Sequence, residues 1–479
     1  MTPTRCLSLV AALVLLGTSA GAQEFDRSMV PAPGTTPTVP SPDVHRRTLP
    51  NGLELWTVTR TDLPIINAVL AIRAGSAEDG ALPGLANVTA GLLDEGSTDR
   101  TGPEFARAVA GLGISLNAGA GIERTTVSLQ TLTRTADSAF ALLGELVTRP
   151  AFAQAEIDRD RQLRINSLGA RQDQPTVIAT QLFNATVFGK DSPYGHPGDG
   201  TPASIEAMSR ADITGFHQKY YRPANAVLVV VGDVTPDRAA ALVTSALGNW
   251  QGKSAAREAI PAAPPAPAAA VYLVDKPKAA QSEIRIGAVG ASRTSPDYYA
   301  LSVLNTLLGG QFSSRINLNI RENKGYTYGA RSNFTFLRGR GPWVASSGVV
   351  TAKTDSSLIE FMRELVDIRG SRPATAAEVD FATGSIIRSY PRRLETNSGV
   401  AGELAELAYY RLPPSELADY QKRIGAVTPV DVNRVAVKYI QPEHFTTVVV
   451  GDLSVIQTGV EALNLGPVRV VTPEGSLVP

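Results

Sequence analysis

The pentapeptide VVVGD occurs twice in the chain, at Val229–Asp233 and at Val448–Asp452, with a shift of 219 residues. The tripeptide ELV recurs with the same shift of 219 residues, at Glu145–Val147 and at Glu364–Val366. Two unrelated short matches with one offset are hard to obtain by chance. The sequence therefore indicates an internal duplication.

Each copy has the pattern of a mixed helix and strand fold. The β-branched run VVV followed by Gly-Asp is typical of a strand buried on both faces. Each ELV ends a segment with helical apolar periodicity, SAFALLGELV at 138–147 and SLIEFMRELV at 357–366. The segment RTTVSLQTL at 124–132 alternates as a half-buried strand does. We predict an α+β protein with two homologous domains, each an antiparallel-rich sheet with helices packed on it.

Length and composition agree with two globular domains. A chain of 479 residues is too long for one ordinary core, and we predict domains at 45–250 and 271–470. The Pro/Ala-rich stretch 251–270 is predicted to link them outside both cores. Lys+Arg and Asp+Glu both number 45, so no field that attracts polyanions is present and no nucleic-acid partner is expected.

Residues 1–22 have the pattern of a signal peptide. Arg5 precedes the apolar run Leu7–Leu16, and the small residues Ala20–Ala22 predict cleavage after position 22. The alternative of a retained membrane anchor is disfavoured because this run is too short to span a bilayer comfortably. We expect an exported, periplasmic chain without a stable membrane anchor, in which the Pro/Thr/Ser-rich residues 23–44 form a flexible lead-in.

Several kinds of catalytic site are missing from the sequence. The only cysteine, Cys6, lies in the predicted signal peptide, so the mature chain has no thiol nucleophile. No phosphate-binding loop is present, and no two of the four histidines lie within four residues of each other, which excludes a helical two-histidine zinc site. His196 and His217 remain as candidate ligands brought together by folding, or, as is more usual, as hydrogen-bonding loop and surface histidines.

Three long segments resemble the M16 family of metallopeptidases, the pitrilysin, insulin-degrading and mitochondrial-processing-peptidase group. HRRTLPNGLELWTVTRTDLPIINAVLAIRAGS at 45–76 is similar to the first two strands of that family, and GTPASIEAMSRADITGFHQKYYRPANAVLVVVGDV at 200–234 is similar to the end of its first domain. RINLNIRENKGYTYGARS at 315–332 resembles a signature of its second domain. The resemblance covers nearly all of residues 45–465.

The resemblance implies that a zinc site has been lost. Active members carry H-x-x-E-H on a helix represented here by PGLANVTAGLLDEGST at 83–98, with a further glutamate ligand about 75 residues on. Asn87 and Gly91 occupy the histidine positions, Ala90 the general-base position and Ser167 the distant glutamate position. None supplies a basic metal ligand, so no metal or other cofactor is expected in this chain. Asp94 and Glu95 are expected to form the solvated end of the same helix.

The second half retains a substrate motif of the family. Members use an arginine and a tyrosine seven residues apart to hold and polarise the substrate carbonyl, and Arg321 and Tyr328 match these positions. A guanidinium stays charged and a phenol hydroxyl can donate to a developing oxyanion. The alternative is that Arg321 forms a surface ion pair and Tyr328 packs on a sheet.

The resemblance implies a division of labour between two chains. In the first interpretation, this chain is the non-catalytic, substrate-binding subunit of a heterodimer with an H-x-x-E-H-containing M16 partner, which holds the zinc and hydrolyses peptides. A second interpretation is a purely structural or peptide-binding homologue. A third is an autonomous metallopeptidase with unconventional ligands.

The first prediction concerns metal content. We expect the purified mature chain to bind no stoichiometric zinc, because Asn87, Gly91 and Ser167 offer no basic ligand set. Elemental analysis of the dialysed protein checks this. About one tightly held zinc per chain contradicts it and favours the autonomous peptidase.

Overall fold

The computed structural model describes residues 34–35, 37–253 and 267–478. The predicted signal peptide, most of the lead-in and most of the predicted linker lie outside the described residues. Within the part of the chain that the structure describes, no helix has the length and apolar character needed to cross a membrane.

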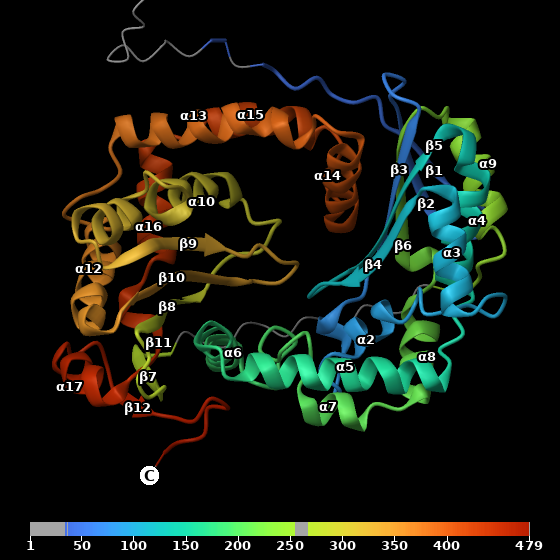
Figure 1. Cartoon of the computed structure of the whole chain (residues 1–479). Coiled ribbons are helices and arrows are strands. Elements are labelled where there is room, and N and C mark those ends of the chain that lie inside the picture. The colour runs from blue at the N-terminus through green and yellow to red at the C-terminus, as the bar shows by residue number, and fades with distance from the viewer. Residues whose placement is uncertain (1–33, 36, 254–266, 479) are drawn as a thin grey trace, which may run out of the picture. The chain divides into compact units, whose positions relative to one another are not determined.

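The first sheet has six strands in the order β1-β2-β6-β3-β5-β4 (Figure 1). Its strands are β1 (His45–Thr48), β2 (Glu54–Thr59), β3 (Ile65–Ile72), β4 (Ser115–Ala120), β5 (Thr125–Leu132) and β6 (Ala226–Gly232). The central strand β6 contains the first VVVG and is buried along its whole length. It pairs parallel with β2 and antiparallel with β3.

The second sheet also has six strands, in the order β12-β7-β11-β8-β10-β9. Its strands are β7 (Ala270–Asp275), β8 (Gln281–Val289), β9 (Thr327–Phe334), β10 (Pro342–Val350), β11 (Thr446–Gly451) and β12 (Val468–Val470). Strand β11 contains the second VVVG and pairs parallel with β7 and antiparallel with β8, as β6 does with β2 and β3. The two VVVGD strands are therefore equivalent, and the predicted duplication is confirmed.

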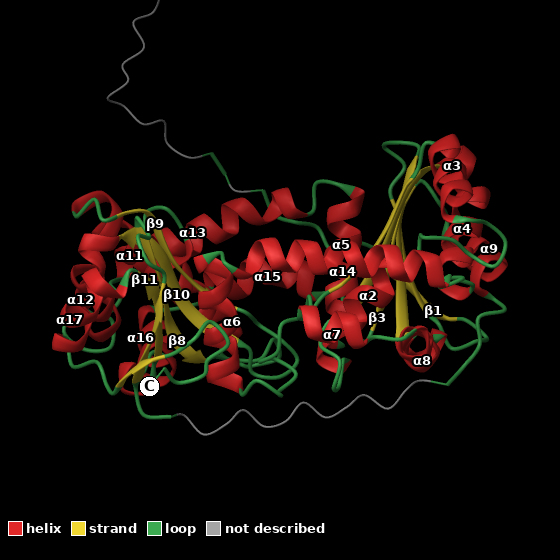
Figure 2. Cartoon of the chain, turned by 60° about the horizontal axis from the view of Figure 1, so that its bottom comes forward, coloured by secondary structure: helices red, strands yellow, loops and turns green. Residues whose placement is uncertain are grey.

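The two ELV helices are also equivalent, because each follows the strand that lies second from one edge of its sheet. The helix α4 (Ala136–Thr148) follows β5, and α12 (Thr354–Asp367) follows β10. Other helices of the first half are α2 (Leu85–Gly91), α3 (Gly102–Leu112), α5 (Gln154–Gln172), α6 (Pro175–Phe188), α7 (Pro202–Ala207), α8 (Arg210–Tyr220) and α9 (Pro236–Leu247). Those of the second half are α10 (Tyr298–Asn305), α11 (Arg315–Asn317), α13 (Ala376–Arg393), α14 (Asn397–Tyr410), α15 (Glu416–Gly425), α16 (Pro429–Tyr439) and α17 (Leu453–Ala462). Figure 2 shows these helices in red on the faces of the two yellow sheets.

Each half gives one helix to the sheet of the other half. Helix α14 packs on β3 and β6 of the first sheet, opposite α4 and α9 (Figure 1). Helix α6 packs on β8 and β11 of the second sheet. Val229 and Val231 of β6 accordingly join a cluster with α14, and Val448 and Val450 of β11 join one with α6. The exchange explains why both VVV runs are buried on both faces.

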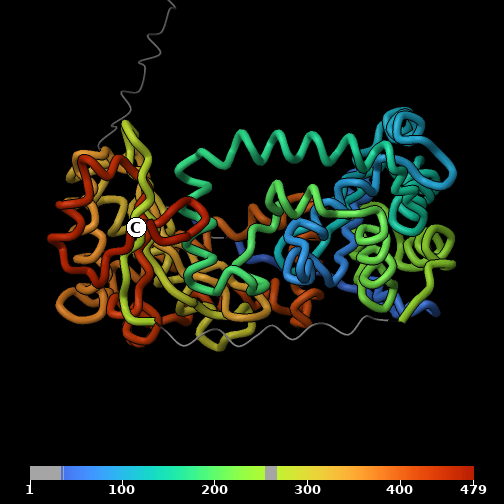
Figure 3. Tube along the Cα trace, turned by 90° about the horizontal axis from the view of Figure 1, so that it is seen from below, coloured from blue at the N-terminus to red at the C-terminus, as the bar shows by residue number. Residues whose placement is uncertain are grey.

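Each of the exchanged helices, α6 and α14, is preceded in the chain by a long helix. Helix α5 leads directly into α6, and Figure 3 follows the pair along the chain. Helix α13 leads into α14 and begins with a capping box, in which the Thr375 hydroxyl accepts from the backbone N–H of Glu378 and the Glu378 carboxylate accepts from the backbone N–H of Thr375. The capping box fixes where α13 starts.

The second prediction tests the exchange. Leu404 of α14 is fully buried in the cluster that covers the first sheet. We expect Leu404→Ala to lower the free energy of unfolding by about 2–5 kcal/mol, because it leaves a cavity between the two halves. Urea unfolding followed by tryptophan fluorescence measures this, with Trp56 in the first half and Trp343 in the second as reporters.

The matched control is Leu163→Ala, because Leu163 is exposed on α5. Its effect is expected to stay within about 0.5 kcal/mol. If Leu404→Ala shifts only the transition of the first half and leaves the Trp343 transition in place, the halves unfold independently and the exchange does not couple them.

Candidate functional site

The helix that the resemblance matches to the family's zinc helix is short. Helix α2 spans Leu85–Gly91 and is capped at Leu92, so Asp94 and Glu95 lie beyond it, and the expectation that both carboxylates share this helix was wrong. The backbone leaves the helical conformation at Leu92, with φ −95° and ψ 0°, and Leu92 and Leu93 are both buried in the core. The Asp79 carboxylate accepts from the N–H groups of Gly84 and Ala86 and so caps the start of α2.

An arginine side chain lies between α2 and α5, beside Asn87 and Gly91. The Arg164 guanidinium donates to Asn87 Oδ1 at 3.1 Å and is held from the other side by Asp160, at 2.6 Å. A Cβ added at Gly91 would lie 2.4 Å from Arg164 Nη2, which is closer than two non-bonded atoms approach each other, so the guanidinium would have to move. The glycine at position 91 therefore makes room for the guanidinium.

The predicted metal-site residues lie on two helices, α2 and α5. Asn87, Ala90 and Gly91 share α2, and Ala90 is buried. Ser167 lies on an exposed part of α5, and the residue of α5 that contacts Asn87 is Arg164. Arg164 lies 77 residues after Asn87, so the spacing of about 75 residues already pointed to this helix but not to this position.

The residues present do not fit a zinc ion. Zinc in proteins is bound by thiolate, imidazole and carboxylate groups. The α2 positions offer one amide, and the neighbouring group is a permanently charged cation that repels a metal ion. Among the described residues, no group of three or more His, Cys, Asp or Glu side chains is arranged to hold a metal.

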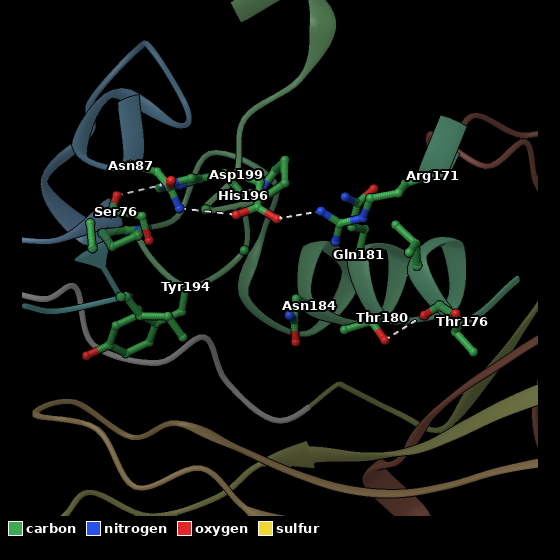
Figure 4. A pocket seen from close by; sticks show the side chains of 18 of the residues that line it. Ser76, Asn87, Arg171, Thr176, Thr180, Gln181, Asn184, Tyr194, His196 and Asp199 are labelled. Atoms are coloured by element: carbon green, nitrogen blue, oxygen red, sulfur yellow. Dashed lines mark hydrogen bonds and ion pairs between the residues drawn. The ribbon is translucent and has the colours of Figure 1, made fainter. Parts of the chain in front are cut away.

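Hydrogen bonds continue from Asn87 to a loop and back to α5. Because Arg164 bonds to Asn87 Oδ1, the amide nitrogen faces Asp199 and donates to it at 3.2 Å (Figure 4). The other oxygen of Asp199 binds Arg171, at 3.1 Å. Arg164 and Arg171 lie two turns apart on α5, so this chain of contacts fastens α5 to α2 at two points.

A cavity of about 440 Å³ opens beside this chain of contacts. Its walls come from the end of β4, the loop before α7, and α6 (Figure 4). The α6 side contributes the polar side chains of Thr176, Thr180, Gln181 and Asn184. A cavity of this size with several amide and hydroxyl groups can hold a few residues of a peptide.

His196 lies in the wall of this cavity and has a structural role. Its Nδ1 and Nε2 lie 2.9 Å from the carbonyl oxygens of Ser192 and Ser76, and Asp79 lies 3.6 Å away. Burial lowers the pKa of His196, but the bonds to Asp79 and to the two carbonyls outweigh it, so the pKa is raised. The ring thus contacts the carboxylate that caps α2, and burial raises the pKa of that carboxyl group as well. His217 lies elsewhere, with Nε2 bonded to Val147 O, so the two histidines do not form one site.

Arg321 lies on a π-helical segment, Leu318–Asn323, and a second π-helical segment, Thr306–Gly310, precedes it. Such segments are rare and are concentrated at functional sites. The Arg321 guanidinium stacks over the Phe312 ring at 4.6 Å and contacts Glu322 at 3.2 Å. Phe312 is nevertheless 60% exposed. The arginine is thus oriented by an aromatic ring but remains accessible.

Tyr328 points into solvent because of a β-bulge. The register between β9 and β10 shifts between Ser347 and Val349, which pair with Ala330 and Thr327, so β9 carries one extra residue at this point. A bulge of this kind re-aims a side chain and is common beside active sites. Tyr328 is 89% exposed, whereas Ala330 and Phe334 of the same strand are buried. Neither Arg321 nor Tyr328 belongs to the described residues that line the cavity beside α2.

Comparison with known proteins identifies related sequences. The model of the insulinase family (peptidase family M16) matches residues 58–195, and that of the peptidase M16 inactive domain matches residues 207–383. The chain is 28% identical over 403 residues to an uncharacterized zinc protease of Mycobacterium leprae, covering 83% of this chain and 89% of that one. It is 26% identical over 403 residues to an uncharacterized zinc protease of Streptomyces coelicolor, covering 82% and 86%.

Solved structures with the same fold were also found. The crystal structure of a peptidase M16 inactive domain from Pseudomonas fluorescens superposes with a TM-score of 0.81 at 26% identity, covering 86% of this chain and 98% of that one. A protease from Helicobacter pylori superposes with a TM-score of 0.78 at 24% identity, covering 85% and 99%.

The third prediction tests whether Arg164 blocks the metal position. We expect the variant Asn87→His/Ala90→Glu/Gly91→His to bind no tight zinc while Arg164 is present, because the guanidinium repels the ion and overlaps a side chain at position 91. Adding Arg164→Glu should give about one zinc per chain. Chelator competition and elemental analysis measure both variants. Stoichiometric zinc in the first variant contradicts the assignment of Arg164.

The fourth prediction concerns pH. Because the pKa of His196 is raised in the folded protein, its contribution to stability is complete below about pH 6.5, the value of an unfolded histidine. That contribution is lost as the pH rises through the folded pKa. We expect the urea midpoint of the native protein to fall above pH 6.5 more steeply than that of His196→Gln. Equal slopes in the two proteins mean that His196 is neutral in the fold.

Proposed function

Because the chain belongs to the M16 (insulinase) family of peptidases, we propose that it is a non-catalytic, peptide-binding subunit of an exported M16 zinc peptidase. The first half supports this proposal because a bulky cation and an amide stand where a metal site would be. The residues of that region can fasten helices together, but they cannot activate water.

The observation that carries the proposal is the presentation of Tyr328. A tyrosine on an otherwise half-buried strand is turned outward by a bulge and left 89% exposed. Irregular backbone of this kind persists where a function requires it. The π-helical turn under Arg321 is a second irregularity in the same short segment. Both support a substrate-binding role rather than a relict motif.

The chemistry of the two side chains suits an acyl-transfer site. The Arg321 guanidinium offers N–H donors to a peptide carbonyl. The Tyr328 hydroxyl can donate to the oxygen that gains negative charge when a carbonyl is attacked. A zinc-bearing partner with an intact H-x-x-E-H motif would supply the activated water. In this arrangement, Arg321 and Tyr328 bind and polarise the substrate across the interface.

The sheets offer a way to hold an extended peptide. Strand β4 is the edge of the first sheet and ends at the cavity beside α2. An unpaired edge strand has free N–H and C=O groups that can pair with a peptide backbone. The polar groups of α6 lie across the same cavity and can take up side chains. The alternative role of a purely structural homologue makes no use of these features.

The fifth prediction is catalysis in trans. The chain alone should hydrolyse no peptide, whereas a mixture with a zinc-bearing M16 partner should be active. In that mixture, Tyr328→Phe is expected to lower turnover by about a hundredfold, because it removes one oxyanion donor. Arg321→Ala should in addition raise KM. Steady-state kinetics on a fluorogenic peptide, with size-exclusion chromatography for assembly, measure these effects.

A matched control is Tyr272→Phe, which removes the hydroxyl of a tyrosine on β7 whose partner is Arg469. It should leave turnover unchanged. Full activity of Tyr328→Phe in an assembled complex shows that the retained pair is scaffold, and the structural-subunit alternative then holds.

A further inference from the structure

A second large cavity lies in the first half, on residues that the proposed peptide site does not use. Its volume is about 460 Å³, and it lies between the C-terminal end of α4, helix α8 and the segment that follows α9. The buried rings of Phe152, Tyr221 and Trp250 form its floor. A concave site of this size is in the range that small ligands occupy.

The charged groups of this cavity are all of one sign. Arg149, Arg210 and Arg222 line it, and no aspartate or glutamate is among the described residues that do. The other polar groups are threonine hydroxyls and the amides of Gln218, Asn249 and Gln251, which can donate hydrogen bonds. Three guanidinium groups in one hollow create a positive potential that low-dielectric walls strengthen.

Two of the three arginines are held in place by backbone carbonyls rather than by carboxylates. Arg210 donates from Nε to Phe152 O at 2.7 Å and from Nη2 to Ala151 O at 3.2 Å. Arg222 donates from Nη1 to Gln251 O at 3.1 Å. A carbonyl orients a guanidinium without neutralising its charge. A guanidinium has five N–H donors, so these bonds leave several for a ligand.

The backbone is irregular at both anchoring points. Phe152 has a φ of 44°, an uncommon conformation for a bulky residue that costs on the order of 1–3 kcal/mol. Gly252 has a φ of 130°, and a Cβ there would lie 2.3 Å from Arg222 Cδ. The backbone is therefore strained at Phe152, whose carbonyl group holds Arg210, and it needs a glycine at position 252, beside the Arg222 side chain.

The Arg149–Asp99 pair and His217 change the positive charge of the cavity little. Arg149 pairs with Asp99 at 2.9 Å, but both side chains are about half exposed. Exposed ion pairs contribute little to stability, so a ligand can replace the carboxylate. His217 packs between Phe152 and Tyr221, and burial lowers its pKa to about 4, so it is neutral at pH 7. The positive charge of the cavity therefore comes from the arginines and does not depend on pH near neutrality.

We propose that this cavity, which we call the triple-arginine pocket, binds a phosphate oxyanion. Arginine forks bind phosphate oxygens in pairs, and three of them match the charge of a phosphomonoester or diphosphate group better than that of a single carboxylate. Such a group is carried by soluble phosphorylated molecules and by phospholipid headgroups. The pocket is independent of Arg321 and Tyr328.

Sodium pyrophosphate is the probe, and isothermal titration calorimetry of the whole mature chain is the measurement. We expect saturable binding that weakens at least tenfold in Arg222→Gln and in Arg149→Gln, because each variant removes a charge-assisted contact. The matched control is Arg107→Gln, which removes an exposed arginine that likewise donates to a backbone carbonyl, Pro103 O, on α3. Circular dichroism melting confirms that each variant is folded.

Co-sedimentation distinguishes the two sources of phosphate. Vesicles of phosphatidylcholine with and without phosphatidylglycerol are incubated with the native chain and with Arg222→Gln. Binding to the anionic vesicles that the variant loses identifies a headgroup ligand, whereas pyrophosphate binding without vesicle binding identifies a soluble one.

Three results with pyrophosphate overturn the proposal. They are the absence of saturable pyrophosphate binding, equal affinity in the native chain and both pocket variants, and an equal loss of affinity in Arg107→Gln. A glutamate-rich peptide that binds the pocket more tightly than pyrophosphate also overturns it, because the ligand is then an acidic peptide.

Discussion

The reciprocal exchange of α6 and α14 is the constraint on which the rest of the structure depends. A sheet with helices on one face leaves its other face uncovered, and each half covers that face of the other half. Val229 and Val231 meet α14, and Val448 and Val450 meet α6. Burial of apolar surface at about 25 cal/mol per Å² on both sides makes each half a part of the other half's core. The exchange also carries the polar face of α6 to the cavity beside α2.

Arg164 joins two helices at the positions where the resemblance places a metal site. A zinc ion can join two helices through its ligands, and here a guanidinium joins α2 to α5 through Asn87 and Asp160. Gly91 removes the Cβ that would collide with it. The arrangement keeps a positive charge between the helices, but it has no exchangeable water and no Lewis acidity. The first half thus has the fold of an M16 domain with a guanidinium between α2 and α5.

The second half differs because its irregular backbone is concentrated at the retained motif. Two π-helical segments and a bulge occur between Thr306 and Gly329, within one stretch of chain. Regular helix and strand geometry would bury the tyrosine with Ala330 and Phe334. Stacking on Phe312 holds Arg321 without an enclosing pocket. Arg321 is thus held by an aromatic ring, and Tyr328 is exposed on the same stretch of chain.

The sequence by itself determined the duplication, the α+β class and the central strands, because apolar periodicity and a repeated β-branched run report burial directly. It also showed that α2 lacks metal ligands. Only the tertiary structure decided that Arg164, and not Ser167, meets Asn87, since an ungapped match cannot say which face of α5 turns inward. The sequence alone also did not indicate the helix exchange or the triple-arginine pocket. Both arise from residues far apart in the chain, and local pattern carries no information about such contacts.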